Sequence, residues 1–320
     1  MKALRFLNNN LSLAEIAQPE RENEAVVRVL KSGICNTDLE IVRGYAGFQG
    51  TIGHEFVGVV EKAVDAPDLI GKRVVGEINA GCGVCDLCLE VDSRHCPNRT
   101  VLGIVGRDGC HAEFLTLPAR NLLEVPENVS DAEAVFAEPL AAAFGITEQV
   151  EIFPETKLAV IGDGKLGTLC ARGLALKSNE VVLVGKHREK LRVAEKRNVE
   201  GVLLADALKM KKCFDVVVEA SGAETGFALA LDLIKPRGKL VLKSTFHGTP
   251  RWEAWRVVVD EITIVGSRCG RFAPALDLLK NKRIDVADLI SDEFDLSDGV
   301  RAIRRAGEKG VMKVLLSITN

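Results

Sequence analysis

Short apolar runs alternate with helix-compatible segments between residues 157 and 267. The run LAVI (158–161) leads into a glycine-rich turn, and VVLV (181–184) follows after a stretch that is compatible with a helix. Further strand-like runs lie at 214–222, 238–245 and 261–267, and segment 225–238 is expected to form a helix that Pro236 and Gly238 end. Strands that alternate with helices predict a parallel, doubly wound α/β sheet.

The glycine-rich turn has the spacing of a phosphate-binding loop. Gly162, Gly164 and Gly167 form G-x-G-x-x-G between a strand and a helix-compatible segment. One glycine permits the tight turn, one lets the backbone approach a phosphate, and one lets the helix pack closely on the strand. We expect these glycines, with Lys165 and Leu166 between them, to bind a dinucleotide.

The end of the second strand predicts which dinucleotide is bound. In NAD enzymes an acid at this point holds the ribose 2′-hydroxyl, whereas this chain has Gly185, Lys186, His187 and Arg188 in a row. The missing acid and the three potentially cationic side chains favour NADP over NAD. The alternative is a solvated basic loop that opens the next helix and binds no phosphate.

Composition limits the class of protein. A chain of 320 residues with 47% hydrophobic content exceeds what one ordinary core holds, so two domains are expected. A formal net charge of −3 gives no general attraction to nucleic acid or to a membrane surface. The sequence has neither a signal-peptide pattern nor an apolar run of the ~18 residues that a spanning helix needs. We therefore expect a cytoplasmic protein.

Four of the nine cysteines, Cys82, Cys85, Cys88 and Cys96, lie within GCGVCDLCLEVDSRHC. Two disulfides, a metal or a reactive pair could explain them. The odd number of cysteines and the reducing compartment disfavour disulfides. Two-residue gaps fold the backbone into tight turns that converge the sulfurs, so we expect a tetrahedral structural zinc that takes no part in chemistry.

A second set of candidate ligands lies upstream. Cys35 in SGICNTDLEIVRG and His54 in TIGHEFVGVVE are of the types that catalytic zinc takes, although each, taken alone, would more often be an ordinary core residue. Thr37 places a hydroxyl near Cys35, and Asp38 could orient the imidazole of His54 from outside the metal's ligand shell.

A third ligand is expected from FAEPLAAAFG, where Glu138 interrupts an apolar segment. A buried carboxylate needs a partner, and zinc would supply one. The alternative is an ion pair at a helix start, and Glu55 competes for the ligand role. His111 is expected to be structural or at the surface, and His247 is a weaker candidate.

Taken together, these motifs resemble the medium-chain, zinc-dependent alcohol dehydrogenases, and in particular their polyol and threonine dehydrogenase branch. GICNTD and GHEFVG are similar to the family's first two zinc-ligand segments, and AEPL to the third-ligand segment of the polyol branch. IGDGKLG is similar to the cofactor turn. VGSRCG resembles the return into the catalytic domain, with Arg268 placed to approach the cofactor's phosphates.

The resemblance implies a fold. Residues 1–140 and 269–320 would form a GroES-like barrel with the cysteine lobe at 81–97, and residues 141–268 a Rossmann domain. Association through the last strand of the cofactor sheet, near 261–266, would give a homodimer or homotetramer.

The resemblance also implies an activity. Zinc held by Cys35, His54 and Glu138 would polarise an alcohol, Thr37 would relay its proton, and the nicotinamide would take a hydride. Glu40 stands where classical members have the histidine that ends the proton relay. The implied substrate is a small alcohol or carbonyl compound, with two zinc ions per chain. The alternatives are a zinc-independent quinone or alkene reductase, and a non-catalytic dinucleotide-binding relative.

Overall fold

The chain divides into two compact units in a computed structural model that describes residues 1–195, 198–244 and 253–318. Unit 1 comprises Met1–Glu138 and Phe272–Asn320, and unit 2 comprises Pro139–Arg271. These boundaries lie two or three residues from the expected ones at 140 and 269. In the described part of the chain, no helix is both long enough and apolar enough to cross a membrane.

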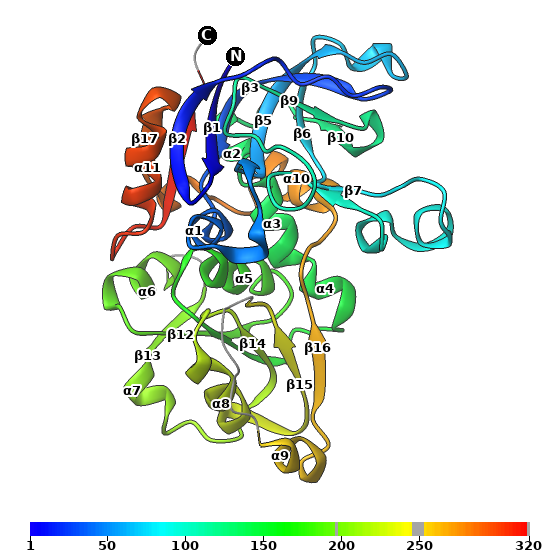
Figure 1. The fold of residues 1–320 in the computed structure, drawn as a ribbon. Coiled ribbons are helices and arrows are strands. Elements are labelled where there is room, and N and C mark those ends of the chain that lie inside the picture. The colour runs from blue at the N-terminus through cyan, green and yellow to red at the C-terminus, as the bar shows by residue number, and fades with distance from the viewer. Residues whose placement is uncertain (196–197, 245–252, 319–320) are drawn as a thin grey trace. The chain divides into compact units, whose positions relative to one another are not determined.

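Unit 1 is built mainly from short strands (Figure 1). Its strands are β1 (Lys2–Leu7), β2 (Asn10–Glu15), β3 (Ala25–Gly33), β4 (Gly50–Thr51), β5 (Glu55–Lys62), β6 (Arg73–Gly76), β7 (Asn79–Ala80), β8 (Thr100–Val101), β9 (Phe114–Leu117), β10 (Leu122–Glu124), β17 (Ile290–Asp295) and β18 (Lys313–Ser317). Its helices are α1 (Asn36–Val42), α2 (Asp131–Ala134), α10 (Phe272–Lys280) and α11 (Gly299–Ala306).

Both ends of the chain contribute to one sheet of unit 1. Seven strands form it, in the order β10-β6-β5-β3-β18-β17, with β9 also paired to β3. β18, close to the carboxyl end, pairs antiparallel with β3, so that Leu315 lies opposite Gly33. On its other side β3 pairs with β5 and places Gly33 opposite Glu55. Residues that are far apart in the sequence therefore meet where these strands end.

Unit 2 contains the predicted parallel sheet. Its strands are β11 (Lys157–Ile161), β12 (Glu180–Gly185), β13 (Glu200–Leu203), β14 (Phe214–Glu219), β15 (Ile234–Leu242) and β16 (Thr263–Gly266). Its helices are α3 (Ala137–Phe144), which begins at the boundary, α4 (Ile146–Gln149), α5 (Lys165–Leu174), α6 (Arg188–Glu195), α7 (Leu204–Ala207), α8 (Glu224–Leu233) and α9 (Ala254–Val259).

All six strands of this sheet run parallel, in the order β13-β12-β11-β14-β15-β16. The chain adds strands outward from β11 through β12 to β13, and then returns to add β14 on the other side of β11. Such a reversal creates a crevice at the carboxyl ends of the strands, where doubly wound folds bind ligands. The predicted sheet is confirmed, and its switch point lies between β11 and β14.

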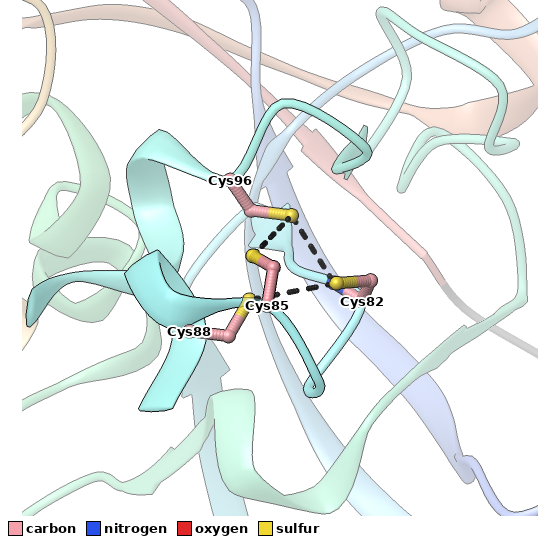
Figure 2. A group of neighbouring side chains, drawn as sticks. All are labelled: Cys82, Cys85, Cys88 and Cys96. Atoms are coloured by element: carbon pink, nitrogen blue, oxygen red, sulfur yellow. Dashed lines mark hydrogen bonds between the residues drawn. The ribbon is translucent and has the colours of Figure 1, made fainter. Parts of the chain in front are cut away.

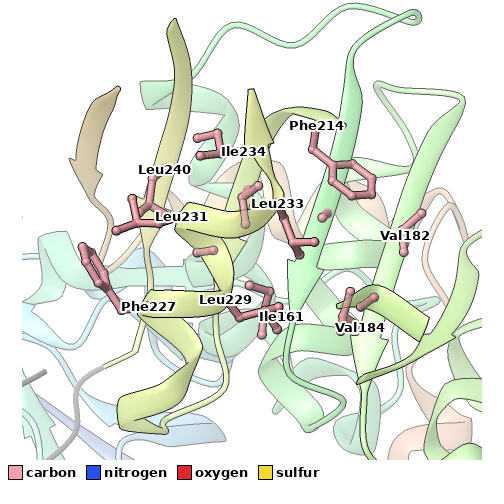
Figure 3. Packing of buried hydrophobic residues seen from close by; sticks show 14 of the residues in the cluster. Ile161, Val182, Val184, Phe214, Phe227, Leu229, Leu231, Leu233, Ile234 and Leu240 are labelled. Atoms are coloured by element: carbon pink, nitrogen blue, oxygen red, sulfur yellow. The ribbon is translucent and has the colours of Figure 1, made fainter. Parts of the chain in front are cut away.

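Apolar packing between α8 and the sheet holds unit 2 together. Phe227, Leu231 and Leu233 of α8 are buried in one cluster with strand residues such as Ile161 and Val184 (Figure 3). The near-continuous apolar strands reflect a sheet that is covered by helices, because strands buried on both faces do not alternate apolar and polar residues.

The helix expected over 225–238 was predicted too long. α8 ends at Leu233, and β15 begins at Ile234, so Pro236 and Gly238 lie inside the strand. Proline disfavours the helical conformation of the residue before it, which already excludes Lys235 from the helix. The register between β14 and β15 is irregular between Phe214 and Val216, where the strand accommodates this segment.

Candidate functional site

The four clustered cysteines converge, as Figure 2 shows. The sulfurs of Cys82, Cys85, Cys88 and Cys96 all lie within 4.8 Å of one another. The Cys82 and Cys88 sulfurs are 3.9 Å apart, and those of Cys85 and Cys96 are 3.7 Å apart. Thiolates at ~2.3 Å from a tetrahedral zinc lie about 3.8 Å from each other, so these residues fit that ion.

Local structure explains how so short a segment gathers four thiols. Cys82 directly precedes a bend at residues 83–85, which Cys85 ends; Cys88 lies in a π-helical turn (Leu87–Val91), and Cys96 ends a 3₁₀ turn. Backbone N–H groups, first that of Val84, lower the pKa of Cys82 to about 6. At Cys85 the backbone N–H of Cys88 lowers the pKa, but burial and the neighbouring thiols raise it to about 12. Cys82 is therefore the thiol of the lobe that most readily becomes a thiolate, which is the form that binds a metal.

The second group of candidate ligands is buried in unit 1. Cys35 follows β3, and His54 and Glu55 stand at the start of β5; the pairing of Gly33 with Glu55 brings these two strand ends together. One donor atom from each of Cys35, His54 and Glu55 lies within 4.8 Å of the others. Glu55 Oε1 is buried and has no hydrogen-bond partner among the described residues, so it is available to a metal.

Asp38 lies between two buried histidines. Its Oδ1 is 3.6 Å from Nδ1 of His54, and its Oδ2 is 3.6 Å from Nε2 of His111. Oδ2 also accepts a hydrogen bond of 2.7 Å from the backbone N–H of Cys35. Burial opposes ionisation of Asp38, but the charge of His54 and the hydrogen bond from His111 hold its pKa far below the usual range.

This position suits a residue that orients His54. Of the two alternatives expected for His111, structural or at the surface, the structure excludes the surface: His111 is fully buried, and its Nδ1 is 2.8 Å from the hydroxyl of Ser32. His247 lies outside the described residues.

Sequence reasoning missed Lys313, which is fully buried beside the same centre. Its ammonium forms an ion pair with Oε2 of Glu55 and lies 5.5 Å from the centre of the Phe136 ring. Burial opposes protonation of Lys313, but the Glu55 carboxylate raises its pKa. A single lysine at the start of an apolar strand looks like a surface residue, and only the pairing of β18 with β3 places it here.

Glu138 lies near the same charges, but it is not part of the close group. It forms no hydrogen bond or ion pair with the described residues. Burial, opposed by the charge of His54 and reinforced by that of Glu55, raises its pKa to about 7. Burial also opposes protonation of His54, yet the thiolate of Cys35 and the charge of Asp38 raise its pKa well above the usual range. The buried carboxyl groups of Asp38, Glu55 and Glu138 thus share the positive charges of His54 and Lys313, and a divalent cation would stabilise their ionised forms.

The two remaining candidates of this region lie on α1. Thr37 Oγ1 is 3.7 Å from the Cys35 sulfur, so its hydroxyl is beside the proposed ligand. Glu40 follows one turn later and forms an ion pair of 2.7 Å with Arg43. Residues three apart lie on one side of a helix, so Thr37 and Glu40 share a face of α1.

The glycine turn of unit 2 has the geometry of a phosphate-binding loop. Gly162 has a φ of +120°, a backbone conformation that residues with a side chain rarely adopt. A Cβ on Gly167 would lie 1.8 Å from the carbonyl oxygen of Gly162. No atom of the structure lies within 4 Å of where a Cβ on Gly164 would be, so the backbone there is open to a ligand. Lys165 and Leu166 begin α5, and the N-terminus of a helix favours an anion.

Two of the three basic side chains at the end of β12 have acidic partners that the sequence did not predict. Gly185 is buried, Lys186 and Arg188 are exposed, and Arg188 forms an ion pair of 3.1 Å with Glu195. His187 Nδ1 lies 3.1 Å from Oδ2 of Asp163, a residue of the glycine turn that the sequence did not single out. Arg268 is exposed and follows β16, and its carbonyl accepts a hydrogen bond from Lys243.

Comparison with known families decides the class of this protein. Residues 21–127 match the alcohol dehydrogenase GroES-like domain, and residues 164–281 match the zinc-binding dehydrogenase domain. The chain belongs to the zinc-binding alcohol dehydrogenase family. This confirms the predicted family and fold class, with a GroES-like unit 1 and a Rossmann unit 2.

Relatives cover almost the whole chain. An L-threonine 3-dehydrogenase of Salmonella arizonae is 30% identical over 343 residues, covering 99% of both chains. A sorbitol dehydrogenase of Halalkalibacterium halodurans is 26% identical over 316 residues, covering 92% of both. A crystal structure described as a zinc-binding dehydrogenase of Sinorhizobium meliloti, bound to NADP, has a TM-score of 0.90 and 26% identity over 99% of both chains.

Family membership also confirms the predicted enzyme class. The chain is a dehydrogenase of the zinc type, with a nicotinamide dinucleotide as cofactor and a small alcohol or carbonyl compound as substrate. The zinc-dependent prediction is favoured over a zinc-independent reductase and over a non-catalytic relative.

Proposed function

We propose that this dehydrogenase transfers a hydride reversibly between a secondary alcohol and NADP, with one catalytic and one structural zinc per chain. The buried group of Cys35, His54 and Glu55 carries this proposal, because one donor atom of each lies within 4.8 Å of the others. The cysteine lobe would hold the structural ion, since four thiolates leave no position for a substrate.

Glu138 is the proposed third ligand of the catalytic zinc, with Cys35 and His54. The charge of Glu55 is already compensated by Lys313, whereas Glu138 has no such partner in the described structure. A carboxylate oxygen of Glu55 lies close enough to Cys35 and His54 for Glu55 to replace Glu138 when the site rearranges.

The side chains of the site have separate tasks in this proposal. Bound zinc would act as a Lewis acid on the substrate oxygen, and the nicotinamide would exchange the hydride. Thr37 Oγ1 would accept the proton of the substrate hydroxyl, and Glu40, on the same face of α1, would pass it to water. Asp38 would hold the ring of His54 in one orientation and would not react.

The proposed substrate has a secondary hydroxyl on a polar carbon chain. Sorbitol and threonine, which name two of the relatives, share this group, and a polyol, sugar or amino alcohol fits that chemistry. NADP is the proposed preferred cofactor, because residue 185 is glycine and Lys186 is an exposed cation beside it. The cytoplasmic location stays a prediction.

We also propose that the chain forms a homodimer or homotetramer through β16, the edge strand of its sheet. Trp255, Val258 and Val259 of the preceding helix α9 are exposed, and apolar side chains gathered beside a free strand edge favour association. Light scattering is expected to give at least twice the mass of one chain, and Val258→Asp is expected to lower it.

Zinc analysis tests the main proposal. Protein purified without chelator should contain two zinc ions per chain, and Cys35→Ser should contain one, with turnover of secondary alcohols lost and NADP binding kept. Cys213→Ser is the matched control, because Cys213 is exposed and outside both groups. One zinc in the unaltered protein that Cys35→Ser does not change would contradict the catalytic site.

A further inference from the structure

A carboxylate occupies the end of β12 although residue 185 is glycine. Asp163 follows Gly162 in the glycine turn, and its side chain reaches across to the neighbouring strand. A Cβ built on Gly185 would lie 2.5 Å from the Cβ of Asp163 and 2.5 Å from its Oδ2. The Asp163 side chain thus fills the space that a side chain at position 185 would take.

Hydrogen bonds fix this carboxylate in place. Oδ2 accepts from the backbone N–H of Lys186 and from that of His187, each at 2.7 Å, and lies 3.1 Å from Nδ1 of His187. Asp163 is only 9% exposed. Two successive backbone N–H groups form a small anion-binding concavity. In this chain that concavity already holds an anion of the protein itself.

The second oxygen of the carboxylate has a different environment. Oδ1 accepts no hydrogen bond within the ranges that the structure describes, so it is available to a hydroxyl of a ligand. Doubly wound folds place the adenosine ribose of a dinucleotide at this strand end, where an acid accepts the 2′-hydroxyl. Position 185 lacks that acid, and Asp163 of the glycine turn brings a carboxylate to the same place.

We propose that Asp163 takes the part of the strand-end acid and sets the cofactor preference of this dehydrogenase. Its Oδ1 accepts the 2′-hydroxyl of NAD, and its charge opposes the 2′-phosphate that Lys186 and His187 attract. The chain therefore binds both cofactors, and NADP less selectively than its basic residues alone would dictate. This inference rests on the proposed function only in that a dinucleotide binds at the glycine turn.

A substitution of Asp163 that removes only its charge separates the effect of this carboxylate from that of the neighbouring basic residues. Asp163→Asn keeps the shape and an acceptor oxygen for the loop but removes the charge, so NADP should bind more tightly and NAD less tightly. We expect the ratio of dissociation constants, NADP to NAD, to fall by about tenfold or more, because like charges in contact are costly. Titration calorimetry with each nucleotide measures this without turnover.

A matched control and a second variant keep the test interpretable if Asp163→Asn does not fold. Asp206→Asn removes an exposed carboxylate that pairs with Lys209 elsewhere in the same unit, and it should leave the ratio unchanged. Asp163→Ser also removes the charge and keeps an acceptor, so it replaces Asp163→Asn if that variant does not fold. In the unaltered protein, the two dissociation constants should lie within about tenfold of each other.

Several outcomes would overturn the inference. Equal weakening of both nucleotides in Asp163→Asn would mean that Asp163 only holds the loop. An unchanged ratio in the variant, or a preference of the unaltered protein for NADP above about tenfold, would also contradict it. Binding of neither nucleotide by the unaltered protein would remove the proposed function and this inference together, whereas the other outcomes leave dinucleotide binding intact.

Discussion

The two ligand groups of unit 1 are built in opposite ways. The cysteine lobe takes its four proposed ligands from 15 consecutive residues, Cys82–Cys96, and only Cys96 is buried. The other centre takes its proposed ligands Cys35, His54 and Glu138 from three separate segments, and its neighbour Lys313 comes from a fourth. One group consists of like thiols held by local turns, and the other of unlike charges held by strand pairing.

This difference suits the cysteine lobe to stabilising the fold and the buried centre to chemistry. The cysteine lobe forms through local turns, so it can bind an ion without the long-range strand pairing of unit 1. A bound ion would then supply folding energy. The buried centre instead depends on the sheet being formed already, and the pKa values of its Asp38, His54 and Glu138 side chains are displaced. Displaced pKa values in a buried cluster are typical of sites that do chemistry.

The largest expected effect is on the lobe. Cys96→Ser removes a thiolate from the structural zinc, and the free energy of unfolding of unit 1 should fall by at least about 5 kcal/mol, since such sites contribute ~10–16 kcal/mol in small zinc peptides. Denaturant unfolding with zinc analysis measures it. Exposed Cys213→Ser should stay within about 0.5 kcal/mol of the unaltered protein. A stable Cys96→Ser that keeps its zinc would mean that the lobe is not a metal site.

The next effect comes from the buried centre. Lys313→Met leaves Glu55 as an uncompensated buried charge, which should cost about 3–5 kcal/mol of the free energy of unfolding. Adding Glu55→Gln should recover most of this loss, because no charge then remains unpaired. The control is Lys72→Met, which breaks the exposed pair with Glu124 and should cost about 0–1 kcal/mol. A double variant no better than Lys313→Met would show that packing, not charge, is at stake.

The contrast also explains what could be predicted from the sequence. The lobe, the glycine turn and the parallel sheet follow from local spacing and apolar periodicity, which act over a few residues. Lys313 and Asp163 act across strand neighbours, and no local pattern marks a lysine or an aspartate for such a role. The end of α8 was missed because Pro236 was expected to stop a helix, although it lies in the first part of a strand.

A third effect depends on pH. The pKa of Glu138 is raised from 4.5 to about 7. Its neutral form is therefore favoured in the folded protein, and the stability it contributes is present below pH ~4.5 and lost as pH rises towards ~7. In zinc-depleted protein, unfolding free energy should fall by up to about 3 kcal/mol more between pH 5 and pH 7.5 than in Glu138→Gln. Parallel pH profiles of the two proteins would exclude a buried, unpartnered carboxylate.

The smallest expected effect concerns the transfer of a proton to solvent, which only the buried centre requires. A structural zinc exchanges nothing with solvent, whereas a proton released beside Thr37 must leave the site. Glu40 lies on the same face of α1 as Thr37, and Arg43 holds its carboxylate. Because water can replace an outer relay group, Glu40→Gln should lower kcat only about threefold to tenfold, well under the ~100-fold of a positioned acid or base. Arg43→Met breaks the same exposed ion pair but keeps the carboxylate, so its kcat should match the unaltered enzyme. Equal losses in both variants would assign the effect to the position of α1 and not to proton transfer.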